Sequence, residues 1–130
     1  MSANRETVSA MYEAMARGDV PAVLAMFDPQ IDWTDAEGFM TEGHYVGPEA
    51  VVQGVFGPLF AEFPNFAVRP DEIIDGGDRL VTLGRYTGTH ATTGKSFDAA
   101  FAHVWTIANG LATTFRQFVD AAPTEEARRS

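Results

Sequence analysis

The chain of 130 residues has the length of one domain, and its 45% of hydrophobic and 12% of aromatic residues exclude a disordered polypeptide. The formal net charge of −9 at pH 7 repels phosphate backbones and anionic lipids, so we expect neither nucleic acid nor membranes as partners. The sequence has no cysteine, which excludes disulfides and thiol catalysis, and with no export signal or apolar run of ~18 residues we expect a cytoplasmic protein.

Three helices are predicted in the first half of the chain. Apolar residues recur at helical spacing over residues 4–17, and Gly18 ends that helix. Asp19 is a typical N-cap and begins a second helix that reaches about Phe27. A broad apolar face indicates a third helix over residues 47–63.

The segment between the second and third helices combines a short strand with a long loop. Residues 31–35 have the pattern of a strand. The loop that follows, about a dozen residues long, mixes glycines with polar and aromatic residues, and long ordered loops in compact domains are often functional.

Four β-rich runs follow the third helix, and glycine-containing turn signals separate them. The runs cover residues 66–74, 79–91, 96–108 and 111–120. Helices followed by antiparallel strands predict an α+β domain in residues 1–121, with the helices on one face of a curved sheet. Residues 122–130 are predicted to form a frayed tail.

The strongest hairpin signal is Asn109-Gly110, and a two-residue loop there fixes which residues of the last two strands lie opposite each other. The residues that share one face by this count are Ala99, Phe101, His103, Trp105, Thr114, Arg116, Phe118 and Asp120. The preceding hairpin, counted about residues 93–94, adds Tyr86 and His90 to the same face.

This face mixes large aromatic rings with Gly84, Gly88 and Ala99, which have little or no side chain. Such a mixture is typical of the walls of a cavity, so we expect a deep pocket for a small hydrophobic or aromatic ligand. The opposite face is predicted to be apolar too, and carries Val81, Leu83, Ala102, Val104, Phe115 and Val119. A sheet that is apolar on both sides needs a second cover, so we expect a homodimer.

Together these motifs resemble the nuclear-transport-factor-2-like superfamily, and within it the SnoaL-like polyketide cyclases and the ketosteroid isomerases. The resemblance covers roughly residues 5–121. It rests on the Gly18-Asp19 turn between two helices, on MFDPQIDWTD, on the helix start GPEAV, and on the closing hairpin HVWTIANGLATTFRQFVD. It implies a cone-shaped, curved antiparallel β-sheet wrapped around three N-terminal helices, the cystatin-like α+β barrel.

The resemblance to ketosteroid isomerases also implies positions for their functional residues. Their general-base aspartate falls on Asp35, and their oxyanion-hole aspartate falls near Ala102 or His103, so that it would be replaced by a histidine at best. Their oxyanion-hole tyrosine falls on Met11, with Tyr12 one position away and expected to point elsewhere. The resemblance therefore implies an incomplete oxyanion hole, which argues against steroid isomerisation.

Two other groups in the superfamily match at the end of the last strand. SnoaL-like cyclases have an aspartate that matches Asp120 and a histidine near His103. Limonene-type epoxide hydrolases are also similar at Asp120, but the arginine and aspartate that they carry on an earlier strand fall on Arg85 and Thr87. The second carboxylate of those hydrolases is therefore missing.

Asp120 is the leading candidate for a general base, because a carboxylate among aromatic and small residues is poorly solvated and its pKa rises. On the same predicted face, His103 could move a proton or polarise a carbonyl, and Arg116 could hold an enolate. Asp35 is a candidate second acid or base. The alternatives are an Asp120 that caps the strand in solvent or pairs with Arg116, a His103 that belongs only to the core, and a solvated Asp35.

The aromatic candidates for substrate binding are Trp33, Phe56, Phe60, Tyr86, Phe101, Trp105 and Phe118. We expect no cofactor and no metal, because the three histidines are scattered and no glycine-rich phosphate loop follows a strand. The sequence favours acid/base chemistry on a hydrophobic carbonyl compound by an isomerase, cyclase or related lyase. The alternatives are a non-catalytic ligand-binding or dimerisation module and an epoxide-hydrolase-like enzyme.

Overall fold

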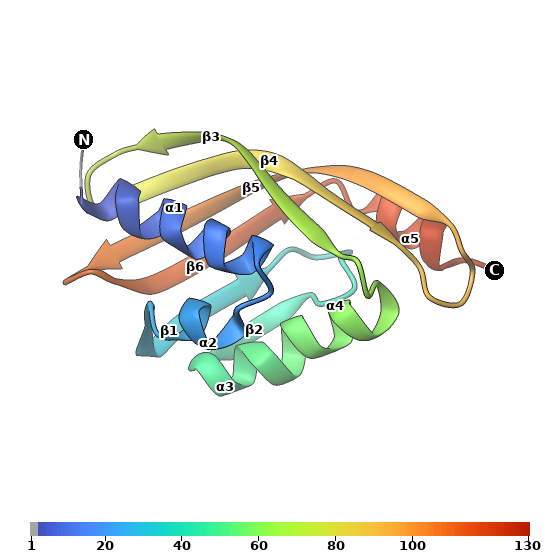
Figure 1. The fold of residues 1–130 in the computed structure, drawn as a ribbon, viewed down its shortest axis with the longest axis horizontal. Coiled ribbons are helices and arrows are strands. Elements are labelled where there is room, and N and C mark those ends of the chain that lie inside the picture. Colours follow the sequence, from blue (N-terminus) through green and yellow to red (C-terminus); the bar gives the residue numbers. More distant parts are fainter. Residues whose placement is uncertain (1–2) are drawn as a thin grey trace.

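The computed structural model describes residues 3–130 as one curved sheet with helices packed against it (Figure 1). The helical elements are α1 (Ala3–Ala16), α2 (Val20–Leu24), α3 (Pro48–Val51), the π-helix η1 (Val52–Phe56), α4 (Gly57–Glu62) and α5 (Ala122–Arg128). The strands are β1 (Phe27–Asp35), β2 (Gly43–Val46), β3 (Ala67–Asp75), β4 (Arg79–Thr89), β5 (Ser96–Ala108) and β6 (Leu111–Val119). The predicted α+β class is confirmed.

The six strands form one sheet in the order β2-β1-β6-β5-β4-β3. All neighbouring pairs are antiparallel except β1 and β6, which run parallel. The first strand of the chain therefore lies beside the last one, and α1 crosses the same sheet at the β3 end (Figure 1). The space between the helices and the sheet is the interior of the cone.

The predicted boundary between α2 and β1 was wrong by several residues. Gly18 ends α1 with a φ of +70°, and the Asp19 carboxylate caps α2 by accepting a hydrogen bond of 3.1 Å from the Ala22 amide, as expected. The helix then ends at Leu24, and Phe27 already belongs to β1. Phe27 is paired with Ala112 of β6, a contact far away in sequence that no local pattern reveals.

The predicted third helix is continuous, but a π-helical turn interrupts its α-helical geometry between α3 and α4. π-Turns insert an extra residue and are common at functional sites. Val55 and Phe56 of this segment line the interior cavity, as do Leu59 and Phe60 of α4.

The predicted long loop before α3 contains the short strand β2, which sequence reasoning missed. β2 pairs with β1, and Tyr45 lies opposite Trp33. The ring of Tyr45 packs over Gly54, where a Cβ atom would come within 2.1 Å of Cε1 of the ring. Gly54 thus lets the loop lie directly on η1.

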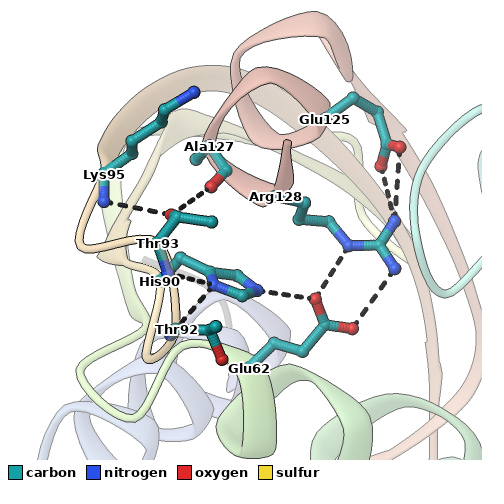
Figure 2. Close-up of polar contacts among 8 residues, drawn as sticks. All are labelled: Glu62, His90, Thr92, Thr93, Lys95, Glu125, Ala127 and Arg128. Atoms are coloured by element: carbon teal, nitrogen blue, oxygen red, sulfur yellow. Dashed lines mark hydrogen bonds and ion pairs between the residues drawn. The ribbon is translucent and has the colours of Figure 1, made fainter. Parts of the chain in front are cut away.

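The prediction of a frayed tail was wrong, because residues 122–128 form α5. Figure 2 shows how ion pairs hold this helix: the Arg128 guanidinium contacts the Glu62 carboxylate of α4 at 2.8 and 3.2 Å, and it also contacts Glu125. His90, in the β4–β5 loop, lies 3.0 Å from the same Glu62 carboxylate. The acidic and basic residues of this segment bind partners distant in sequence, which is why the sequence alone resembles a solvated end.

The predicted register of β5 and β6 was also wrong by one residue. The Asn109-Gly110 turn pairs Ala108 with Leu111 as expected, but a bulge at Thr113 then shifts the pairing. Beyond the bulge, His103 is opposite Gln117 instead of Arg116. Every residue of β6 after Thr113 therefore points to the side opposite to the one predicted.

The register of β4 and β5 differs from the prediction by two residues, because the turn spans residues 90–95. Tyr86 is opposite Ala99 and Gly84 is opposite Phe101. A shift of two residues keeps every side chain on its predicted face, since side chains alternate with a period of two. Tyr86, Phe101 and His103 accordingly are buried on the inner side.

Aromatic side chains dominate the core. The rings of Trp33 and Phe115 stack with centroids 3.7 Å apart, and Trp105 packs edge-on against both. Within residues 3–130, no helix combines the length and the hydropathy that a membrane span requires.

Candidate functional site

A cavity of about 220 Å³ lies between the inner face of the sheet and the helices. Most of its walls are apolar and come from α1, α2, η1, α4 and β3. The apolar residues that line it include Met15, Val20, Val23, Trp33, Val55, Phe56, Leu59, Phe60, Phe66, Val68 and Phe115. The polar residues of the lining are Asp35, Tyr86, His103 and Gln117 from the sheet, together with Asp19 at the start of α2.

Asp35 is a buried carboxylate at the end of β1, with 3% of its surface exposed. Its Oδ1 atom accepts a hydrogen bond of 2.8 Å from the Trp33 indole, and its Oδ2 atom accepts one of 2.6 Å from the Thr41 hydroxyl. Burial raises the pKa of Asp35 to about 6, although both hydrogen bonds lower it. The carboxyl group is thus poised to exchange a proton near neutral pH.

His103 is a buried imidazole in the middle of β5 with a tyrosine at each ring nitrogen. Nδ1 lies 2.7 Å from the Tyr12 hydroxyl, and Nε2 lies 2.5 Å from the Tyr86 hydroxyl. Burial lowers the pKa of His103 well below 6.5, so the ring is neutral at physiological pH. A neutral imidazole donates from one nitrogen and accepts at the other.

Gln117 links the segment that carries Asp35 to Tyr86. Its Oε1 atom accepts a hydrogen bond of 3.2 Å from the backbone amide of Ala36, and its Nε2 atom donates one of 2.9 Å to the Tyr86 hydroxyl. One amide group therefore connects the residue after Asp35 to Tyr86. Burial raises the pKa of Tyr86 well above its usual value, and the nearby charge of Asp35 raises it further.

Tyr12 does not point elsewhere, as the sequence comparison implied, but into the interior. Its hydroxyl contacts His103 and accepts a hydrogen bond of 3.0 Å from the Trp105 indole. Burial raises the pKa of Tyr12 above its usual value, so it remains a neutral phenol. Counting along α1 without gaps missed this contact by one position.

Six of the predicted site residues do line the cavity: Trp33, Asp35, Phe56, Phe60, Tyr86 and His103. Phe101 and Trp105 lie behind it. The Phe101 ring stacks on Tyr86 and on His103, with centroids 4.5 and 4.0 Å apart, and Trp105 packs edge-on against His103. These two residues support the polar side chains and do not form the wall.

Asp120, Arg116 and Phe118 are not in the cavity, because the bulge at Thr113 turns this part of β6 over. Asp120 and Arg116 are exposed, and 46% of the Phe118 surface is accessible. Arg116 lies over the Phe118 ring at 5.2 Å. The prediction that these three side chains share the inner face with His103 was therefore wrong.

Sequence reasoning missed Gln117, Phe115 and Thr41. The first two follow from the correct β6 register, which depends on the bulge at Thr113 that no local sequence signal marks. The Thr41 contact depends on the path of the loop, which becomes visible only with β2 in place. Among residues 3–130, no cluster of three or more His, Cys, Asp or Glu side chains could hold a metal ion.

Residues 8–115, most of the chain, match the SnoaL-like domain family. The chain belongs to this family. The structure of an NTF2-like protein from Burkholderia thailandensis has 35% sequence identity and a TM-score of 0.94, with 100% of both chains covered. An NTF2-like protein from Burkholderia pseudomallei has 33% identity and a TM-score of 0.91, again with 100% of both chains covered.

More distant structures share the fold. TerC, co-crystallised with polyporic acid, has 24% identity and a TM-score of 0.89, and the match covers 99% of this chain and 100% of TerC. Other neighbours are described as a SnoaL-like polyketide cyclase and as a protein with a ketosteroid isomerase-like fold. Among curated proteins, none matches the sequence. The predicted family and cystatin-like α+β fold are therefore confirmed, whereas the reaction is not given by any of these relatives.

Proposed function

We propose that this SnoaL-like protein performs cofactor-independent acid/base chemistry on a small hydrophobic carbonyl compound, with Asp35 as the general base. One observation carries the proposal. A buried carboxylate, Asp35, and a buried phenol–imidazole pair, Tyr86 and His103, line the same apolar cavity. Removal of a proton next to a carbonyl needs this combination: a base for the carbon acid and a donor for the oxygen.

Asp35 suits the role of base because its pKa lies near neutrality. Burial brings that pKa to about 6, so most of the carboxylate is ionised at pH 7 and yet is more basic than an ordinary aspartate. Asp120, by contrast, is exposed and lies outside the cavity. We therefore assign to Asp35 the role that the sequence suggested for Asp120.

Tyr86 suits the role of oxygen donor because it lines the cavity and is held in place from two sides. Gln117 and His103 both contact its hydroxyl. As an enolate forms, negative charge develops on the carbonyl oxygen, and a preorganised donor in a water-poor site stabilises that charge. The raised pKa of Tyr86 keeps the phenol protonated and able to donate.

The cavity sets the class of substrate. Its volume is about 220 Å³, and cavities of ~150 Å³ lined by apolar side chains already hold benzene. We infer a compact cyclic or aromatic carbonyl compound, with its ring against Trp33, Phe56 and Phe66. The complexes of TerC with polyporic acid and of another neighbour with trimethylamine support the use of this fold for small ligands.

Proton exchange tests the reaction directly. The protein is incubated with 2-indanone or cyclohexanone in D₂O, and NMR follows the loss of the protons beside the carbonyl. We expect exchange that rises with pH through about 6, and at least a hundred-fold loss in Asp35→Asn. Asp120→Asn is the matched control and is expected to retain the wild-type rate. Equal rates for wild type and Asp35→Asn would remove Asp35 as the base.

Binding and hydrolysis measurements, made beside the exchange experiment, separate the two alternatives. Binding of these ketones without any exchange supports a non-catalytic ligand-binding module. Hydrolysis of a cyclic epoxide without exchange of ketone protons supports the hydrolase alternative, in which a carboxylate activates water.

We further propose that a second copy of the chain covers the outer face of the sheet. Leu83 of β4 is opposite Ala102 of β5, which is opposite Phe118 of β6, so the three form one row. Leu83 is 37% exposed and Phe118 is 46% exposed, so the row presents adjacent apolar surface on the outer face of the sheet. Light scattering is expected to show a dimer for wild type and a monomer for Phe118→Asp. A wild-type monomer at 100 μM would contradict this proposal.

A further inference from the structure

The polar groups behind the cavity form a chain of hydrogen bonds whose direction can be deduced. Gln117 fixes one end. The Ala36 amide can only donate, so the Gln117 oxygen faces Ala36 and its NH₂ group faces Tyr86. The Tyr86 oxygen is therefore an acceptor from Gln117, and the phenol still has its own proton to donate.

Trp105 fixes the other end in the same manner. An indole N–H can only donate, so the Tyr12 oxygen accepts the hydrogen bond from Trp105. Tyr12 also retains a proton to donate. His103 lies between the two phenols, is neutral, and can accept from one of them while it donates to the other.

Only two arrangements satisfy these constraints. In one, Tyr12 donates to Nδ1, Nε2–H donates to the Tyr86 oxygen, and the Tyr86 proton is free to point into the cavity. In the other, Tyr86 donates to Nε2 and Nδ1–H donates to Tyr12. The proton of Tyr12 is then free to point toward the buried hydroxyl of Thr82, which lies near Tyr12.

We propose that a ligand oxygen in the cavity selects the first arrangement, with His103 as the Nε2–H tautomer and Trp105 and Tyr12 as positioning residues for the Tyr86 donor. The hydrogen bonds then all run in one direction, from Trp105 through Tyr12, His103 and Tyr86 to the ligand. Aligned hydrogen bonds polarise one another, so the last donor in the chain is the strongest. The site is thereby specific for an oxygen that accepts, such as that of a carbonyl, enolate or phenolate.

This inference rests on the proposed function, because it names the oxygen that Tyr86 stabilises. The tests use 4-nitrophenolate at pH 8 as a stable stand-in for an enolate. They use the Asp35→Asn variant, which removes a like charge beside the ligand. That variant is expected to be catalytically inactive, and binding needs no turnover. The binding tests therefore report on the hydrogen-bond chain alone, whereas proton exchange reports on Asp35 as the base, so the failures of the two proposals are distinguishable.

The first test is the tautomer of His103. Two-bond ¹H–¹⁵N NMR spectra of histidine-labelled protein identify which ring nitrogen carries the proton. We expect Nε2–H for His103 when 4-nitrophenolate is bound, with His44 and His90 unchanged. An Nδ1–H tautomer in the complex would overturn the proposal, and this test leaves every residue of the hydrogen-bond chain unsubstituted.

The second test is a double-mutant cycle between Trp105 and Tyr86. Trp105→Phe removes the first donor, and we expect it to weaken binding of 4-nitrophenolate by about three-fold to ten-fold. In a Tyr86→Phe background the same change is expected to have no effect, and binding of nitrobenzene is expected to be unaltered in both. A loss from Trp105→Phe that is equal for both ligands, or equal in both backgrounds, indicates a merely structural role and would overturn the assignment of Trp105.

Discussion

Trp33 and Asp35, two residues apart on the same side of β1, are joined by a hydrogen bond of 2.8 Å from the indole N–H to the carboxylate. Thr41 donates to the other carboxylate oxygen at 2.6 Å. The position of Thr41 is fixed in turn by Tyr45, whose hydroxyl donates a hydrogen bond of 2.8 Å to the Thr41 carbonyl. The pKa of Asp35 thus reflects a balance between burial and two donors, one of which comes from the loop.

Removal of the loop donor is expected to shift this balance. In Thr41→Val the carboxylate loses a hydrogen bond that favours its charged form, so the pKa of Asp35 rises above about 6, by roughly one unit. The pH profile of ketone proton exchange reports this shift. Thr34→Val, on the other side of β1, is the control and leaves the profile in place. A profile that is the same in Thr41→Val and wild type would show that the hydroxyl does not tune the base.

Asp35 is expected to reduce the stability of the fold at neutral pH. Its folded pKa of about 6 lies above the usual 3.8, so the folded state binds more protons and stability falls as the pH rises from 4 to 6. The shift corresponds to about 3 kcal/mol at full ionisation. Asp35→Asn is therefore expected to raise the free energy of unfolding at pH 8 by roughly 1–3 kcal/mol, and by little at pH 4. Urea denaturation across this range is the measurement, and a gain that is independent of pH would contradict the assigned pKa.

The ion pairs of α5 have the opposite pH dependence. Hydrogen bonds from Arg128, and then from His90, lower the pKa of Glu62. The stability that these contacts give to the fold is therefore fully present above the pKa that Glu62 has in the unfolded chain. It is lost as the pH falls through the lower pKa that Glu62 has in the folded protein. Glu62→Gln is expected to destabilise the protein at pH 7 by about 1 kcal/mol, with a smaller loss near pH 3.5.

Thermal unfolding at the two pH values measures this difference. Glu126→Gln is the matched control, because Glu126 pairs with Arg129 at a side chain that is 63% exposed. Its expected effect is within ~0.5 kcal/mol. If the two variants behaved alike at pH 7, the link between α5 and α4 would contribute nothing beyond an ordinary surface ion pair.

Gly54 is expected to tolerate no side chain. A Cβ atom at this position would lie 2.1 Å from the Tyr45 ring, so Gly54→Ala has to displace the ring and the loop that it anchors. We expect a loss of roughly 1–3 kcal/mol, together with a weaker Thr41 contact to Asp35. Gln53→Ala, one residue earlier and exposed, is expected to change stability by less than ~0.5 kcal/mol. Chemical denaturation of the two variants checks this, and equal stabilities would show that the loop adapts freely.

Much of the fold was predictable because its signals are local. The Gly18-Asp19 junction, the apolar face of residues 47–63 and the glycine turns between strands each follow from a few neighbouring residues. These signals gave the element order, and the family resemblance supplied the cone. The elements that were missed, β2 and α5, are short. β2 is held by its pairing with β1, where Tyr45 lies opposite Trp33, and α5 is held by the contact of Arg128 with Glu62 of α4. In both cases the partner lies outside the element's own stretch of sequence.

The site was predictable only where the pairing of strands did not depend on a bulge. His103 and Tyr86 were placed on the inner face because a shift of two residues between β4 and β5 leaves the faces unchanged, and Asp35 was identified through the family resemblance. Asp120 and Arg116 were misplaced because one extra residue at Thr113 reverses the faces of β6. Tyr12 was misplaced for a similar reason, since a count without gaps along α1 cannot resolve a single position.

The bulge at Thr113 also determines which side chains at the end of β6 turn inward. Without the bulge, the Asn109-Gly110 turn would pair His103 with Arg116, and Arg116, Phe118 and Asp120 would replace Phe115 and Gln117 inside the cone. Removal of Thr113 itself would instead leave a regular hairpin in which Gln117 still lies opposite His103, because the residue removed is the extra one. The present lining of the cavity is therefore compatible with the bulge or with a last strand one residue shorter, but not with a regular hairpin of the present length.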